Sequence, residues 1–171
     1  MRLILLFVPL TFLSAQTHTP TIENESVRVV SVTDAPAKVP GALHEHKQNR
    51  VMVYLDSGDI RIQHADGKVE NQHWTPGDVA WSPANGMHTS QNVSSRPIRI
   101  VEIELKGKGQ ADTTAPPDRT RSIVDNAQVR VYHAIKGPAN RNYVAVNIQT
   151  GEVLWDKVPA GTGPFVITEV K

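Results

Sequence analysis

The chain has 171 residues, of which 39% are hydrophobic and 20% are charged, so it can form one compact domain, or one domain with a small appendage. Its 18 Lys and Arg residues balance 17 Asp and Glu residues, which excludes the basic stripe of a nucleic-acid-binding protein. The lack of cysteine excludes disulfides, thiol catalysis, zinc ribbons and iron–sulfur clusters. Because the charges balance, we expect no nucleic-acid partner.

Residues 1–15 have the pattern of a signal peptide. Arg2 is followed by an apolar stretch from Leu3 to Leu13, and small residues come next. This stretch is shorter than the roughly 20 apolar residues that a membrane span needs. We expect cleavage near Ala15 and export to the periplasm or the extracellular space, with no membrane span. A buried first helix is the alternative.

After this leader the hydrophobic pattern has a period of two, which predicts strands rather than helices. Compact turns rich in Gly, Asp, Asn and Pro separate several of the alternating stretches. Many short strands of this kind are typical of an all-β sandwich or barrel. The predicted strands are 27–32, 51–55, 59–63, 68–74, 78–81, 98–105, 128–132, 143–148 and 165–170.

The chain divides into two unequal β units. Residues 107–121 are rich in Gly, Thr and Pro, which indicates a linker or a long surface loop between residues 16–106 and 122–171. Segment 122–131 is similar to 21–29, and segment 165–171 to 100–106, which indicates a degenerate half-repeat. Chance similarity between β-rich segments is the alternative. We expect the shorter unit to pack on the barrel, by covering a sheet face or extending an edge, or on a dimer partner.

Two histidines form the first candidate motif. His44 and His46 are two residues apart, and this spacing places both imidazoles on one face of an extended strand. A third histidine, His88, lies in a Gly- and Pro-containing segment further along the chain. A histidine pair alone is weak evidence for a metal site, so the second segment carries most of the argument.

Together the two segments resemble the motifs of the cupin superfamily, G-x5-H-x-H-x3-4-E-x6-G and G-x5-P-x-G-x2-H-x3-N. The residues that match the second motif at the family spacing are Gly77, Pro83, His88 and Asn92, with the inner glycine displaced by one residue to Gly86. In the first motif His44, His46 and Gly58 match in place or within one residue, but Gly41 is closer to the histidines than the family glycine, and Arg50 occupies the position of the glutamate.

The resemblance covers about residues 22 to 106 and implies a double-stranded β-helix, a jelly-roll barrel with its site at the mouth. The family's usual site is three histidines and one glutamate around divalent iron, manganese, nickel or zinc. Only His44, His46 and His88 are present here. Three neutral imidazoles can still bind such a metal and leave positions open for a ligand.

Arg50 leaves two arrangements open. Strand alternation turns it toward the same interior as the histidines, where its charge would repel a metal by about 4 kcal/mol per unit charge at about 4 Å and an effective dielectric constant near 20. In the first arrangement Arg50 pairs with Glu102 or Glu104 and the histidines keep the metal. In the second no metal binds, and Arg50 and the histidines bind a small anion.

Other residues add weaker expectations. Gln48 and Tyr54 are candidate ligand-binding side chains near Arg50, while Met52 and Trp81 are expected to line the barrel wall. His64 and His73 flank a turn and are expected to be exposed.

Three functions are compatible with these residues. The first is a metal-dependent enzyme, such as a dioxygenase or an isomerase, that acts on a small oxygenated substrate. The second is a non-catalytic module that binds a small carboxylate or sugar acid. The third is a structural or assembly subunit that forms a homodimer through its outer sheet.

Overall fold

The computed structural model describes residues 16–108, 123–139, 141–159 and 163–171. The leader predicted at 1–15 and most of the linker predicted at 107–121 lie outside these residues. Strands and loops make up the described chain, which confirms the all-β prediction. In this part of the chain no helix has the length and apolar character of a membrane span.

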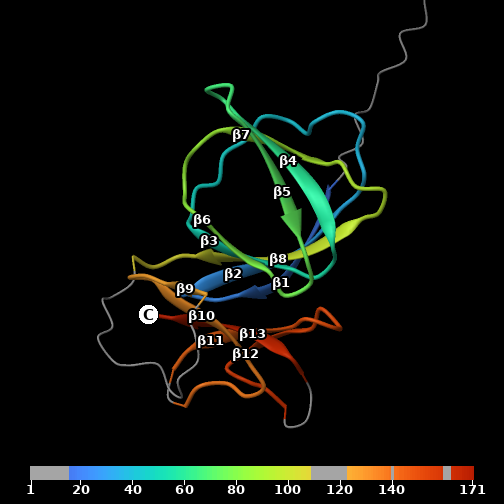
Figure 1. Ribbon diagram of the computed structural model, residues 1–171. Helices are drawn as coiled ribbons and strands as arrows, with labels where there is room; N and C mark the ends of the chain where they lie inside the picture. The colour runs from blue at the N-terminus through green and yellow to red at the C-terminus, as the bar shows by residue number, and fades with distance from the viewer. Residues whose placement is uncertain (1–15, 109–122, 140, 160–162) are drawn as a thin grey trace, which may run out of the picture.

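Three sheets are stacked in layers (Figure 1). The first sheet has the order β1-β2-β8-β3-β6, the second β5-β4-β7, and the third, which we call the C-terminal sheet, β12-β11-β13-β10-β9. The strands of the first two sheets are β1 (Gln16–Glu23), β2 (Val27–Asp34), β3 (Arg50–Tyr54), β4 (Gly58–His64), β5 (Val69–Trp74), β6 (Val79–Ser82), β7 (His88–Asn92) and β8 (Ile98–Leu105). Those of the C-terminal sheet are β9 (Val124–Asp125), β10 (Val129–Ala134), β11 (Tyr143–Asn147), β12 (Val153–Trp155) and β13 (Phe165–Val170).

The first and second sheets face each other and form the jelly-roll barrel. Inward-facing side chains such as Val30, Tyr54, Ile60 and Ile100 build the apolar part of its interior. They alternate along each strand with outward-facing side chains, as the period of two requires. The predicted double-stranded β-helix is therefore present.

The sequence pattern missed β1, β7, β9 and β12. β1 is polar and largely exposed, and it pairs only with β2, so it carries no hydrophobic alternation. β7, with the sequence HTSQN, is polar because its inward side faces the polar end of the barrel. β9 and β12 have only two and three residues.

The C-terminal sheet covers the outer face of the first sheet. Val51, Val53 and Ile103 of the first sheet pack with Val131 and Val144 of the C-terminal sheet in one buried core. The first sheet is thus buried on both faces. A homodimer remains a prediction, and this face of the first sheet is already covered within the chain.

The C-terminal sheet repeats the connectivity of the first sheet. β9, β10, β13, β11 and β12 are paired in the same order as β1, β2, β8, β3 and β6. Matching details recur at the ends of the strands: Lys171 pairs with Asp125 as Lys106 pairs with Glu23. Among the described residues, no strand of the C-terminal unit corresponds to β4, β5 or β7.

Candidate metal centre

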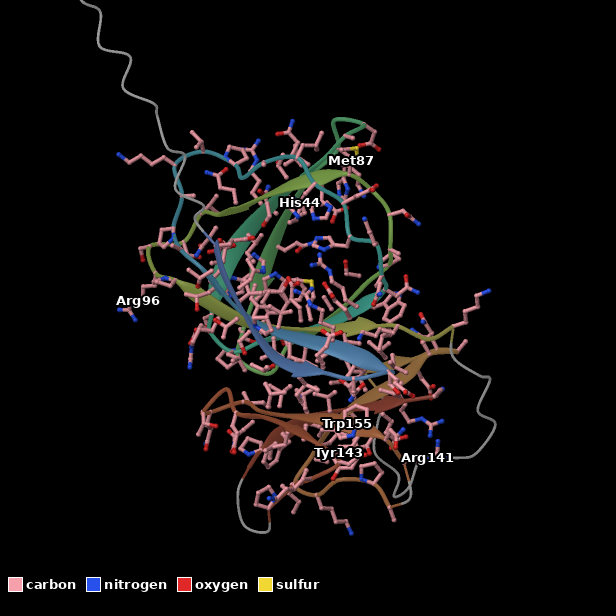
Figure 2. The ribbon with its side chains drawn as sticks, turned by 180° about the vertical axis from the view of Figure 1, so that it is seen from behind. His44, Met87, Arg96, Arg141, Tyr143 and Trp155 are labelled. Carbon is pink, nitrogen blue, oxygen red and sulfur yellow. The ribbon has the colours of Figure 1, made fainter. Side chains whose placement is uncertain are left out.

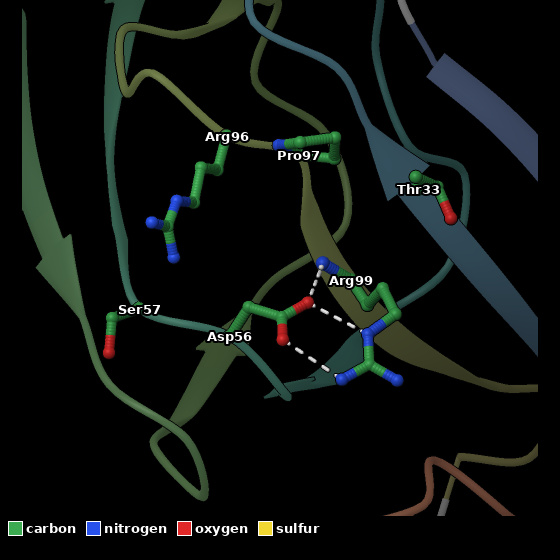
Figure 3. Close-up of a pocket in the computed structure, with 6 residues that line it drawn as sticks. All are labelled: Thr33, Asp56, Ser57, Arg96, Pro97 and Arg99. Carbon is green, nitrogen blue, oxygen red and sulfur yellow. Dashed lines mark hydrogen bonds and ion pairs between the residues drawn. The ribbon is translucent and has the colours of Figure 1, made fainter.

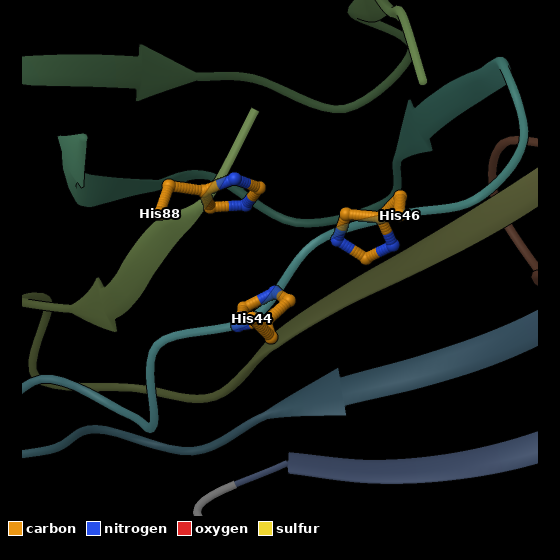
Figure 4. A group of neighbouring side chains, drawn as sticks. All are labelled: His44, His46 and His88. Carbon is orange, nitrogen blue, oxygen red and sulfur yellow. The ribbon is translucent and has the colours of Figure 1, made fainter. Parts of the chain in front are cut away.

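The three motif histidines meet at one end of the barrel (Figure 4). One side-chain nitrogen from each of His44, His46 and His88 lies within 4.8 Å of the others. Their ring centroids are 4.7 to 5.4 Å apart. The sequence prediction that these residues come together is therefore correct.

The local backbone differs from the predicted strand. The segment before β3 is irregular, and His44 is held by an isolated antiparallel bridge to His88, in which each backbone N–H donates to the other residue's carbonyl (3.0 and 2.9 Å). The turn that precedes His88 has Asn85 at φ 66° and Gly86 at φ 92°, a left-handed conformation that glycine and asparagine adopt most readily. His46 enters the site because the N–H of Asn85 donates to its carbonyl at 2.8 Å.

Hydrogen bonds fix two of the imidazole tautomers. The Nδ1 atoms of His44 and His88 lie 2.9 and 3.0 Å from the carbonyl oxygens of Ala42 and Gly86. A carbonyl only accepts, so Nδ1 carries the hydrogen in both rings and Nε2 keeps its lone pair. The buried Nε2 of His46 has no hydrogen-bond partner. Two oriented lone pairs and one unpartnered buried nitrogen fit a cation that accepts electron pairs.

The surroundings of His46 and His88 favour their neutral forms. Burial, followed by the positive charge of Arg50, lowers the pKa of His46 from 6.5 to about 3. Burial also lowers the pKa of His88. Neutral imidazole is the form that binds a metal.

Known protein structures share the fold of this chain. The chain is 26% identical to a cupin domain from Bordetella pertussis, with a TM-score of 0.50, over 54% of this chain and 95% of that one. The chain belongs to the cupin superfamily. AerE from Microcystis aeruginosa has the same fold at 12% identity, with a TM-score of 0.54 and 90% of each chain covered. No family model matches the sequence, and no curated protein matches it either.

In this cupin, the charge of Arg50 is neutralised by a carboxylate. Its Nη1 lies 3.0 Å from Oε2 of Glu102, and its Nε donates to Oγ of Ser82 at 3.2 Å. The side chains of Arg50 and Glu102 are 5% and 10% exposed. Of the two arrangements that the sequence left open, the structure has the Arg50–Glu102 pairing of the first, while Glu104 pairs with Arg28 instead.

The other two predicted ligand-binding residues lie deeper or beside the site. Gln48 is half-buried, and its Oε1 is buried without a hydrogen-bond partner. Tyr54 lies at the far end of β3, where its ring stacks on Trp74 with centroids 3.9 Å apart and planes 7° apart. Burial raises the pKa of the Tyr54 hydroxyl. The structure thus places Tyr54 in the core.

Two expectations about orientation are wrong. Trp81 packs in the core between the first sheet and the C-terminal sheet, because it pairs with Val51 and faces the same way. His64 is not an exposed hairpin residue: it is half-buried and pairs with His88 across β4 and β7. Its ring lies 6.3 Å from that of His88, and its Nε2 lies 3.4 Å from Oε1 of Glu70.

A sequence signal for His64 was present. Ile60 and Ile62 face the barrel interior, and His64 continues the same alternation by two residues. His64 was predicted to be exposed because it is next to the turn at 65–67.

Figure 2 shows the molecule from behind, with the side chains around the histidine end of the barrel. His44 and Met87 lie at the same end of the barrel, and Arg96 lies away from them. Leu43 and Met87, each next to a site histidine in the sequence, are 50% and 44% exposed. The rim of the site is therefore partly apolar.

A pocket of about 550 Å³ lies elsewhere, at the other end of β4 (Figure 3). β4 begins just after Ser57, which lines this pocket, and ends at His64, so the pocket and the histidines are roughly 20 Å apart along the strand. The charged groups of Asp56 and Arg99 in the pocket bond to each other. The site is defined by the histidines rather than by this pocket, which is lined by Thr33, Asp56, Ser57, Arg96, Pro97 and Arg99.

Proposed function

We propose that this cupin binds one divalent metal ion through His44, His46 and His88. The observation that carries the proposal is the convergence of three imidazole nitrogens within 4.8 Å of one another, with the Nε2 of His46 buried and unpartnered. Zinc–nitrogen bonds are about 2.0 to 2.1 Å, so small side-chain rotations would bring all three nitrogens onto one ion. Iron, manganese, nickel and zinc accept such ligands.

The proposed activity is catalysis on a small oxygenated molecule, of the dioxygenase or isomerase type. Three protein ligands leave coordination positions open, where a metal can polarise or activate an oxygen-containing group. The chain's own contribution is an end of the barrel with three imidazoles, the half-buried Gln48, and exposed apolar side chains at Leu43 and Met87. These features suit a ligand without a large net charge.

The alternative of an anion-binding module has less support in the interior. The Arg50 guanidinium is bonded to Glu102 and Ser82, so the fork that would receive a carboxylate is already engaged. For Arg50 to bind an anion, the ion pair with Glu102 would have to open inside the barrel.

Metal analysis of protein purified without an affinity tag tests the proposal. We expect near-stoichiometric iron, manganese, nickel or zinc in the wild type, and its loss in the His44→Ala/His88→Ala double variant. A matched control is His73→Ala, because His73 is exposed and bonds to Asp59 away from the site. Absence of metal, together with carboxylate binding that is lost in Arg50→Ala, would favour the anion-binding module.

Export is a separate proposal that rests on the sequence of residues 1–15. Sequencing the N-terminus of protein recovered outside the cytoplasm tests it. The expected first residue is Gln16, and a protein that keeps Met1 would contradict it.

A further inference from the structure

The C-terminal sheet contacts the histidine-bearing segments through the side chain of Gln128. Gln128 lies just before β10, and its Oε1 accepts a hydrogen bond from Nδ2 of Asn49, which follows His46 by three residues. Its Nε2 donates to the carbonyl of Gly107. Gln128 therefore has both ends of its amide bonded and fixes the side chain of Asn49.

Asn49 in turn connects the two segments that carry the histidines. Its Oδ1 accepts a hydrogen bond from the backbone N–H of Ala84 at 2.6 Å, and its carbonyl accepts one from Leu105 at 2.9 Å. Ala84 begins the turn that leads to His88, and the next residue, Asn85, bonds to the carbonyl of His46. The two segments are thus held together from outside the ring of histidines.

A second contact joins the C-terminal sheet to the start of the His88 segment. Nε2 of His133 in β10 lies 2.9 Å from the carbonyl oxygen of Gly77 and, because that oxygen only accepts, donates to it. A Cβ on Gly77 would lie 3.1 Å from Cδ1 of Ile148 and 3.5 Å from Nε2 of His133. Glycine at this position therefore lets the C-terminal sheet approach the loop closely.

We propose that the C-terminal sheet positions the histidine site, with Gln128 acting through Asn49 to set the spacing between the segment of His44 and His46 and the turn before His88. Covering the first sheet requires only apolar side chains, which the valines of β10, β11 and β13 supply. The amide pair of Gln128 and Asn49 adds a directional contact to the site. A predicted change in Zn²⁺ affinity rests on the proposed function, whereas a predicted change in the hydrogen exchange of the backbone amides does not.

The experiment compares full-length variants after treatment with EDTA. Gln128→Met keeps the length of the side chain but removes both the acceptor for Asn49 and the donor to Gly107, whereas Gln128→Glu removes only the donor. Asn147→Ala is the matched control, because among the described residues the Asn147 side chain accepts hydrogen bonds only from Gln149 and Thr150, within the C-terminal unit. The readouts are the dissociation constant for added Zn²⁺ and the hydrogen-exchange rates of the Ala84 and Asn85 amides.

We expect Gln128→Met to weaken Zn²⁺ binding by up to about tenfold, because losing a direct hydrogen-bond partner of a metal ligand costs about 10- to 100-fold and Gln128 acts further from the ligands, through Asn49. The Ala84 and Asn85 amides should exchange faster in the same variant. Gln128→Glu should retain most of the affinity, and Asn147→Ala should lose stability without losing affinity. If Gln128→Met does not fold, Asn49→Asp carries the comparison, since it keeps the acceptor for Ala84 and removes the donor to Gln128.

Unchanged amide exchange in Gln128→Met, or an equal loss of Zn²⁺ affinity in Asn147→Ala, would overturn the proposal. A wild type that binds no Zn²⁺ and contains no metal as purified would instead overturn the proposed function. In that case the exchange rates of the apo-protein alone decide the positioning role. Faster exchange in Gln128→Met supports it, and equal exchange refutes it.

Discussion

The ion pair inside the barrel gives the sharpest prediction about stability. Nη1 of Arg50 and Oε2 of Glu102 are 3.0 Å apart, and both side chains are almost fully buried. At an effective dielectric constant near 20 their attraction is about 5 to 6 kcal/mol, most of which offsets the loss of hydration of two charges. Removing one partner leaves the other charge buried and alone, which typically costs about 3 to 5 kcal/mol.

We therefore expect Glu102→Gln to lower the free energy of unfolding by about 3 kcal/mol, the lower end of that range because glutamine can still accept a hydrogen bond. The Arg50→Met/Glu102→Leu double variant should stay within about 1 kcal/mol of the wild type, because it leaves no unpaired charge. Glu104→Gln is the control: Glu104, also on β8, pairs with Arg28 of the neighbouring strand β2, nearer to solvent, at 20% and 41% exposure. That change should cost less than about 1 kcal/mol.

Urea unfolding of EDTA-treated protein, followed by tryptophan fluorescence, measures all three variants. The buried ion pair does not contribute as proposed if Glu102→Gln lowers the free energy of unfolding by no more than Glu104→Gln does. The same conclusion follows if the Arg50→Met/Glu102→Leu double variant loses as much free energy of unfolding as Glu102→Gln.

Three further predictions concern other parts of the molecule. Gly77→Ala should lower the free energy of unfolding by about 1 to 3 kcal/mol, because Gly77 has φ 91° and faces the C-terminal sheet closely; unchanged urea denaturation would contradict this. Hydrogen bonds from Arg99 lower the pKa of Asp56, so Asp56 stabilises the fold above its ordinary pKa, and this contribution is lost as the pH falls through the lowered pKa. Asp56→Asn should therefore make the free energy of unfolding depend less on pH in the acid range. An unchanged acid dependence would count against the ion pair. Tyr54→Phe should keep the stacking on Trp74 and leave Zn²⁺ affinity unchanged, and a large loss of affinity in a titration would restore Tyr54 as a ligand-binding residue.

The covalent sequence was sufficient to predict most strands of the barrel, though not β1 and β7, and its histidine set. The alternation along 27–32 and 98–105 appears in β2 and β8, since a half-buried strand must place its apolar residues two apart. His44, His46 and His88 were found from the spacing within the two motifs, even though the second and third histidines are 42 positions apart in the sequence.

Only the tertiary structure decided which face of each strand points into the barrel. The first sheet is buried on both faces, so Val51 and Met52 are both apolar and a period of two cannot say which is inside. For this reason the sequence predicts Trp81 on the barrel side of the sheet, whereas it lies on the side of the C-terminal sheet.

The tertiary structure also decided which carboxylate pairs with Arg50. Glu102 and Glu104 lie on the same face of β8, and only the packing of the strands brings the first to Arg50 and the second to Arg28. The contact of Gln128 with Asn49 joins residues 79 positions apart, across a part of the chain with no periodic pattern. Local sequence sets the period of a strand and the conformation of a turn, whereas long-range contacts depend on how the sheets stack.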